Sequence, residues 1–221
     1  MKLDEHLHDH HDHHDHHDHG SHHHGHHHKL PESFDELRTM AIESLLIEKG
    51  LISADDIDGL IDYYVSDIGP MNGAKVVAKA WTDPEFRQIL KHNGNQALSL
   101  MGLENPQGQL IVMENTPDIH HVVVCTLCSC YPWVLLGLPP TWYKSTAYRS
   151  RVVIDPRSVL KEFGLEVSES VEIRVIDSNA EVRYLIIPER PQGTEEMTEE
   201  ELAALVTRDS MIGVGKPLSP Q

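Results

Sequence analysis

The 221-residue chain is poor in cysteine: it has three, and all of them fall within six residues, at Cys125, Cys128 and Cys130. Because there is no fourth cysteine, one chain cannot build a closed four-sulfur zinc site. The three cysteines therefore indicate a different site, with fewer sulfur ligands than a structural zinc site has.

Positive charge is scarce as well. The chain has 18 Lys and Arg against 35 Asp and Glu, which gives a formal net charge of -17 with histidine neutral. Nucleic acid and anionic membrane surfaces repel such a chain, so we expect neither as a partner. No apolar run approaches the length that spans a bilayer, and the N-terminus lacks the basic stretch and apolar core of a secretion signal. Together with free, metal-binding cysteines, this predicts a cytoplasmic enzyme.

The spacing of the cysteines suits one chelated metal ion. The sulfurs of Cys128 and Cys130 and the backbone nitrogens of Ser129 and Cys130 can surround an ion in a plane. Cys125 can add an axial sulfur and leave the opposite position open, as a catalytic metal requires. Amide nitrogens and thiolates favour cobalt or iron over zinc. Taken alone, these six residues are also compatible with a redox dithiol or a metallochaperone.

Longer runs on both sides of the cysteines form a pattern. The metal-claw loop (residues 125–130) is followed by Tyr131-Pro132-Trp133 and by Leu136-Gly137-Leu138-Pro139-Pro140. Other runs lie at residues 73–84, 106–108, 114–117, 171–175, 188–191 and 206–214. Together they resemble the alpha subunit of nitrile hydratase over roughly residues 33 to 214. Thr126 resembles the cobalt type, since the iron type usually has serine there.

The resemblance implies one cobalt(III) per chain, with iron(III) as the alternative, held by the three sulfurs and the backbone nitrogens of Ser129 and Cys130. It implies that Cys128 is oxidised to a sulfinate and Cys130 to a sulfenate, while Cys125 stays a thiolate. The reaction would be hydration of a nitrile to an amide, by the Cys130 sulfenate or by an activated water. A cysteine nitrilase is excluded because the metal takes every cysteine.

Other roles follow from the same resemblance. Gln107 is expected to donate a hydrogen bond near the metal, the Ser129 hydroxyl to contact an oxidised sulfur, and Trp133 to form an apolar wall for the substrate. The expected partners are a nitrile hydratase beta subunit, in a heterodimer or heterotetramer, a cobalt-insertion activator protein and small nitriles. Two alternatives stay open: the metal subunit of thiocyanate hydrolase and a cobalt storage or delivery protein.

The adjacent His120 and His121 are tempting as further metal ligands. Neighbouring residues of a strand point to opposite faces, so at most one of them could reach the ion. We expect both to be surface or hydrogen-bonded polar groups.

Histidine is concentrated at the N-terminus: residues 6–28 hold 15 of the 18 histidines, interleaved with Asp9, Asp12, Asp15 and Asp18. We expect residues 1–29 to form a disordered tail that gathers metal. A helical arm over residues 30–68 should clasp the beta subunit, a metal-binding catalytic domain should cover 69–214, and residues 215–221 should be a C-terminal tail. The predicted class is α+β, with layered sheets that carry the metal-claw loop.

Local signals predict the individual elements. Helices are expected at residues 34–50, 54–68, 74–81, 84–93 and 156–163 and after the cap formed by Thr198 and Glu201. Strands are expected at residues 109–114 and 119–124, and a hairpin is expected from residues 171–176 and 181–187 around the turn at 177–179.

Overall fold

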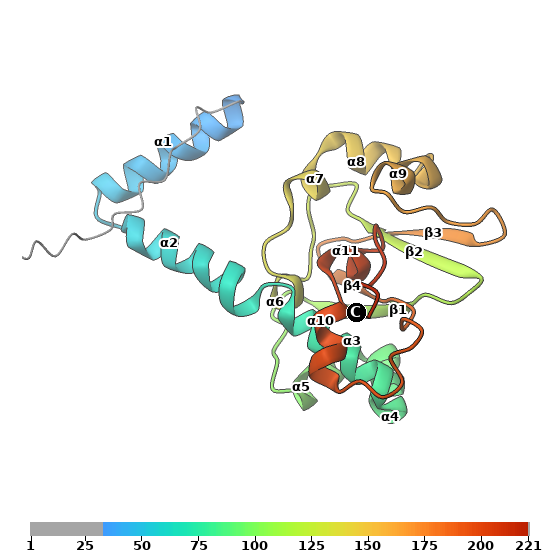
Figure 1. Cartoon of the computed structure of the whole chain (residues 1–221). Helices are drawn as coiled ribbons and strands as arrows, with labels where there is room; N and C mark the ends of the chain where they lie inside the picture. Colours follow the sequence, from blue (N-terminus) through green and yellow to red (C-terminus); the bar gives the residue numbers. More distant parts are fainter. Residues whose placement is uncertain (1–32, 221) are drawn as a thin grey trace, which may run out of the picture. The chain divides into compact units, whose positions relative to one another are not determined.

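The computed structural model describes residues 33–220, which divide into two units with the boundary after Leu51 (Figure 1). The tail predicted for residues 1–29 lies outside the described residues. The other domain limits proposed from the sequence stay predictions.

The described part of the first unit consists of helix α1 (Phe34–Glu48) and the turn after it. The Ser33 side chain accepts a hydrogen bond from the backbone N–H of Glu36, as the capping signal predicts. No residue of α1 is buried, and its apolar side chains are exposed, including Leu37 and Leu45. A helix whose apolar side chains are left exposed by the described residues is typical of a partner surface.

The second unit begins with helices. The sequence predicted three of them, α2 (Ala54–Asp62), α3 (Met71–Thr82) and α4 (Pro84–His92), and it missed α5 (Gly94–Leu100). Ser53 and Asp56 cap α2 reciprocally, and the Asp83 side chain caps α4. After α2 the chain continues as the π-helix η1 (Tyr63–Ile68), which ends at Gly69, a residue with φ +38°.

In residues 33–220, four strands form two separate parallel pairs. Strand β1 (Gln109–Glu114) pairs with β4 (Val182–Ile187), and β2 (Ile119–Val124) pairs with β3 (Glu172–Asp177). The positions of all four strands are confirmed, but the predicted hairpin between the last two is wrong. The Asn179 side chain does turn the chain, by accepting the backbone N–H groups of Glu181 and Val182. The turn leads from one sheet to the other, because each strand pairs with an earlier strand.

Short helices complete the unit. Helices α9 (Pro156–Glu162) and α10 (Glu199–Leu205) follow their predicted caps. The sequence analysis missed α6 (Trp133–Leu136), α7 (Thr141–Lys144), α8 (Thr146–Arg151) and α11 (Arg208–Ile212). Three of these four, α6, α7 and α8, follow the metal-claw loop along the chain, and α6 packs against α3 and η1.

The core lies between α3 and the two strand pairs. Helix α3 packs against α10 and α6, and its Val76, Val77 and Ala78 are fully buried. Strand β2 is buried along nearly its whole length, as a parallel strand with both faces covered should be. The α+β class is confirmed. No described helix is long and apolar enough to cross a membrane, and the cytoplasmic location stays a prediction.

Candidate metal centre

The metal-claw loop begins where β2 ends. Val124, the last residue of β2, lies opposite Asp177, the last residue of β3. The Asp177 carboxylate accepts hydrogen bonds from the backbone N–H of Thr126 at 2.9 Å and from its hydroxyl at 2.5 Å. Because the two strands are parallel, their carboxyl ends meet at one edge, and the neighbouring strand therefore holds the start of the loop.

The three sulfurs come together in this loop. The Sγ atoms of Cys125 and Cys128 are 3.5 Å apart, those of Cys128 and Cys130 are 3.2 Å apart, and all three lie within 4.8 Å of one another. No other group of three potential metal-ligating Cys, His, Asp or Glu side chains occurs in residues 33–220. Cys125 is fully buried and Cys130 is 9% exposed, whereas Cys128 is exposed.

These spacings match ligands of a single ion. With thiolate–metal bonds of about 2.3 Å, two sulfurs at right angles around an ion lie about 3.3 Å apart. The observed 3.2 and 3.5 Å are close to that value. The cysteine set therefore fits a transition metal of square-based or octahedral geometry, as the sequence spacing predicts.

The thiols of Cys128 and Cys130 differ in how readily they lose a proton. Hydrogen bonds from the Cys130 and Cys125 side chains lower the pKa of Cys128, and the backbone N–H groups of Ser129 and Cys130 lower it further. Burial raises the pKa of Cys130 to about 12, and its hydrogen bond with Cys128 adds to the rise. Without a cation, three thiolates this close would repel one another. A bound cation offsets this repulsion, because it favours the deprotonated sulfurs.

Two tyrosines fix the backbone on either side of the sulfurs. The buried Tyr143, in α7, donates its hydroxyl to the Cys130 carbonyl oxygen at 2.9 Å. Tyr148, in α8, donates to the Val123 carbonyl oxygen at 2.7 Å. Burial raises the pKa of both hydroxyls, so both stay protonated and act as donors.

Arg149 holds the middle of the loop. One of its terminal nitrogens donates to the carbonyl oxygen of Cys128 at 3.1 Å and lies 3.5 Å from that of Thr126. Neither Arg149 nor Asp177 could be predicted from the sequence, because they lie 21 and 51 residues from the loop residues they contact. No signal within the loop identifies them. Tyr143 lies 13 residues beyond Cys130, and no local signal indicated its hydrogen bond to that residue.

Gln107 and Trp133 lie together. The side-chain oxygen of Gln107 accepts the backbone N–H of Trp133 at 2.8 Å. The Trp133 ring is partly buried and packs edge-to-face on Tyr64 of η1, with ring centroids 5.4 Å apart. Gln107 therefore reaches the first turn after the metal-claw loop, and its NH₂ group is left to donate elsewhere. The roles predicted for Gln107, Trp133 and the Ser129 hydroxyl stay predictions.

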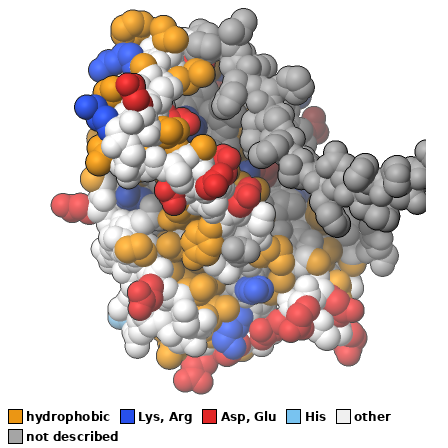
Figure 2. All heavy atoms as spheres, turned by 90° about the vertical axis from the view of Figure 1, so that its left-hand side faces the viewer, with side chains coloured by type: hydrophobic (Ala, Val, Ile, Leu, Met, Phe, Trp, Pro, Cys, Tyr) orange, Lys and Arg blue, Asp and Glu red, His pale blue; other side chains and the backbone are white. Residues whose placement is uncertain are grey.

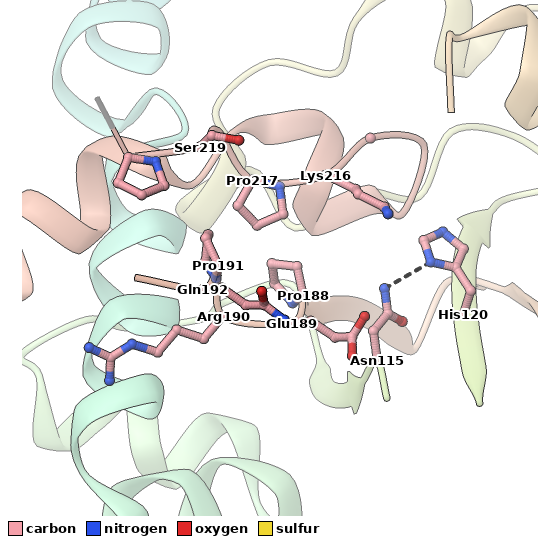
Figure 3. Close-up of a pocket in the computed structure, with 12 residues that line it drawn as sticks. Asn115, His120, Pro188, Glu189, Arg190, Pro191, Gln192, Lys216, Pro217 and Ser219 are labelled. Carbon is pink, nitrogen blue, oxygen red and sulfur yellow. Dashed lines mark hydrogen bonds between the residues drawn. The ribbon is translucent and has the colours of Figure 1, made fainter. Parts of the chain in front are cut away.

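His120 and His121 are buried in the core as hydrogen-bonded polar groups, which is one of the two alternatives expected from the sequence; neither lies at the surface. His120 Nε2 donates to the Gly213 carbonyl oxygen at 2.7 Å, and Asn115 donates to His120 Nδ1 at 3.2 Å (Figure 3). Asn115 accepts the backbone N–H of His121 in turn. Burial lowers the pKa of both imidazoles, so both are neutral at pH 7. His120 lines a cavity of about 440 Å³ with Glu189, Lys216 and several prolines, but no residue of the metal-claw loop lines it.

Comparisons with known proteins place this geometry in a family. The family model for the nitrile hydratase alpha chain matches residues 33–215. The high-molecular-weight cobalt-containing nitrile hydratase subunit alpha of Rhodococcus rhodochrous is 56% identical over 188 residues, which are 84% of this chain and 93% of that subunit. The chain belongs to the nitrile hydratase alpha-chain family.

Two further relatives show how wide the family is. A double mutant of the Fe-type nitrile hydratase from Comamonas testosteroni Ni1 superposes with a TM-score of 0.77 at 43% identity, over 86% of this chain and 93% of that one. The gamma subunit of the thiocyanate hydrolase of Thiobacillus thioparus is 46% identical over 194 residues, which are 82% of this chain and 79% of that subunit. The resemblance stated from the sequence is confirmed, and thiocyanate hydrolase is the lesser match.

Proposed function

We propose that this alpha chain is the metal-bearing subunit of a nitrile hydratase, which adds water to a nitrile and yields an amide. The observation that carries the proposal is the convergence of Cys125, Cys128 and Cys130 at one edge of the β2–β3 pair, in a chain that matches the family over residues 33–215. Cobalt is the proposed metal, because relatives at 56% and 55% identity are named as cobalt-containing.

The three sulfurs and the backbone nitrogens of Ser129 and Cys130 would hold the ion. When bound, a trivalent ion supplies a Lewis acid that polarises a nitrile or acidifies a water. The chain's own part is to keep the ligands in place before the ion and substrate arrive. Asp177 fixes the start of the loop, Arg149 its middle, and Tyr143 its last carbonyl. Such preorganisation avoids rearrangement during the reaction.

Substrate would be placed by the residues just outside the loop. We assign Trp133 to the apolar side of the pocket, because its ring is packed on Tyr64 and partly open to solvent. The side-chain oxygen of Gln107 accepts the backbone N–H of Trp133, so the NH₂ group of Gln107 can orient an oxygen atom near the sulfurs.

A beta subunit is the proposed main partner. The apolar side chains of α1 that the described residues leave exposed support this partner, together with Leu127, which is 82% exposed inside the metal-claw loop itself. On the face drawn in Figure 2, hydrophobic side chains lie at the surface between acidic ones. An activator protein for cobalt insertion is proposed from the resemblance alone.

Two measurements test the function. The chain produced with its beta subunit should convert acrylonitrile to the amide, and peptide mass spectrometry should find added oxygen on Cys128 and Cys130 but not on Cys125. Cys130→Ala should abolish turnover, whereas His120→Gln should keep its cobalt, because His120 bonds to Gly213 and Asn115 rather than to the sulfurs. Unmodified thiols in an active, cobalt-loaded enzyme would contradict the oxidation of Cys128 and Cys130, whereas failure to hydrate nitriles would contradict the proposed function. Turnover of thiocyanate but not of nitriles would favour the thiocyanate hydrolase alternative.

A further inference from the structure

A cavity of about 440 Å³ lies at the carboxyl ends of β1 and β4, a part of the chain that the proposed reaction does not use. Asn115 directly follows β1, and Pro188, Glu189 and Arg190 directly follow β4. The metal-claw loop occupies the corresponding edge of the other strand pair, and none of its residues lines this cavity. Parallel α/β sheets commonly bind ligands at that edge, and the volume is that of a small-molecule site.

Two opposite charges face this cavity. Glu189 and Lys216 both line it, and both side chains extend toward His120 (Figure 3). Lys216 lowers the pKa of His120 and Glu189 raises it, which is consistent with both charges being close to that imidazole. Among residues 33–220, neither charged group has a hydrogen-bond or ion-pair partner, so the two do not neutralise each other. The cavity therefore offers one ammonium group and one carboxylate to a ligand.

The segments that carry these two charges are held in place. Arg190 donates to the carbonyl oxygen of Thr194 and, at 3.0 Å, to its hydroxyl, which anchors the segment next to Glu189. The backbone N–H of Leu218 donates to the last carbonyl oxygen of α10 at 2.8 Å, two residues after Lys216. A ligand would thus meet charges on anchored segments, which lowers the cost of ordering them on binding.

The surroundings of the two charges are neutral and partly apolar. His120 and Asn115 are buried and hydrogen-bonded to each other, and the lowered pKa of His120 leaves its ring uncharged at pH 7. Four prolines also line the cavity: Pro188, Pro191, Pro217 and Pro220. A proline ring is apolar and its backbone has no N–H to donate, so these residues form a surface for an apolar group.

We propose that this cavity binds a small zwitterion, an α-amino acid with an apolar side chain, whose carboxylate pairs with Lys216 and whose ammonium group pairs with Glu189. A lone anion would be attracted by Lys216 and repelled by Glu189, and a lone cation would meet the reverse. A molecule with both charges satisfies both residues, and its apolar side chain lies against the prolines. This site needs neither the metal nor a nitrile, so it is independent of the proposed function.

Equilibrium dialysis against radiolabelled L-leucine tests the proposal, with the full chain alone and with its beta subunit. Both should bind L-leucine saturably. Glu189→Gln and Lys216→Met should each weaken binding about tenfold or more, because each removes a charged hydrogen-bond partner. The matched control is Glu166→Gln, whose side chain lines a neighbouring cavity of about 230 Å³ but not this one, and it should bind as the unaltered chain does. Absence of saturable binding, equal binding by all variants, or loss of binding when the beta subunit is present would overturn the proposal.

Two leucine analogues assign each charge to its partner. Isocaproate lacks the ammonium group and isoamylamine lacks the carboxylate, so each should bind more weakly than L-leucine. Glu189→Gln should weaken the binding of L-leucine but not of isocaproate, and Lys216→Met should weaken the binding of L-leucine but not of isoamylamine. Urea unfolding should be unchanged in both variants, because neither side chain is paired with a described residue. A variant that weakened L-leucine and the matching analogue equally would refute the proposed pairing and the site with it.

Discussion

Replacing Tyr143 by phenylalanine tests whether the hydrogen bond from its hydroxyl to Cys130 holds the metal-claw loop in place. The Tyr143 hydroxyl is the donor to the Cys130 carbonyl oxygen, at 2.9 Å, and the side chain is fully buried. The ring also packs edge-to-face on Tyr131, with centroids 5.1 Å apart. Phenylalanine keeps that packing and removes one oxygen, and with it the bond to Cys130 and the interaction with the Ser178 side chain.

The expected loss of stability follows from leaving the Cys130 carbonyl oxygen without its buried hydrogen-bond donor. A buried acceptor that loses its donor costs about 1–3 kcal/mol, at the upper end where no water can replace the donor. We expect Tyr143→Phe to lower the free energy of unfolding by about 1–2 kcal/mol. Because Cys130 would bind the ion through both its sulfur and its backbone nitrogen, a freer Cys130 should also lower cobalt content and turnover.

The matched control is Tyr148→Phe. It removes a buried hydroxyl of the same kind, whose bond goes to the Val123 carbonyl oxygen inside strand β2. Urea unfolding should show a similar loss of stability in both variants. Cobalt per chain, measured by mass spectrometry, should fall only in Tyr143→Phe. If both variants lost cobalt equally, general destabilisation would explain the result, and the local role of Tyr143 would be refuted.

Three further changes have defined outcomes. Asp177→Asn should cost about 1 kcal/mol of stability and lower cobalt content, because it weakens the two bonds to Thr126, whereas Glu172→Gln on the same strand should leave cobalt content unchanged. Burial lowers the pKa of His120, so the unfolded chain binds a proton there more readily than the folded chain does. The stability of the fold should therefore decrease as pH drops below about 6.5. In melting-temperature measurements, His120→Gln should make this decrease smaller. Gly213→Ala should lower the free energy of unfolding in urea by about 3 kcal/mol or more, because φ is +91° and the added Cβ would meet the His121 carbonyl oxygen. Gly193 has a similar φ but open space around it, so Gly193→Ala should lower the free energy of unfolding by about 1 kcal/mol.

Much of the secondary structure could be predicted because its signals are local. Ser33 with Glu36, Asp83 with Pro84, and Thr198 with Glu201 each mark a helix start within four residues. The short helices α6, α7 and α8 were missed because four to six residues carry too little periodicity. The β3–β4 hairpin was predicted wrongly because a turn signal at Asn179 says where the chain reverses, not which strand it pairs with.

In the candidate site, too, one part could be predicted from the sequence and another part could not. The cluster of proposed ligands could be predicted, because Cys125, Cys128 and Cys130 lie within six residues and chelation depends on that spacing; their role as ligands stays a prediction. Their supports could not: Asp177 reaches Thr126 only because β3 lies beside β2 in parallel register. The burial of His120 was missed for the same reason, since its partner Gly213 lies 93 residues away.

The exposure of the metal-claw loop indicates what a complete site needs. Cys125 and Cys130 are shielded by this chain's own core, whereas Cys128 and Leu127 face outward. Hydration chemistry in a low-dielectric pocket requires that bulk water be kept from the reacting atoms, and an exposed leucine next to a ligand sulfur does not provide that shield. The described residues thus supply the proposed ligands and their anchors but only one wall of the pocket. We propose that a partner subunit supplies the opposite wall, so that two chains build the substrate pocket around a ligand set that comes from this one.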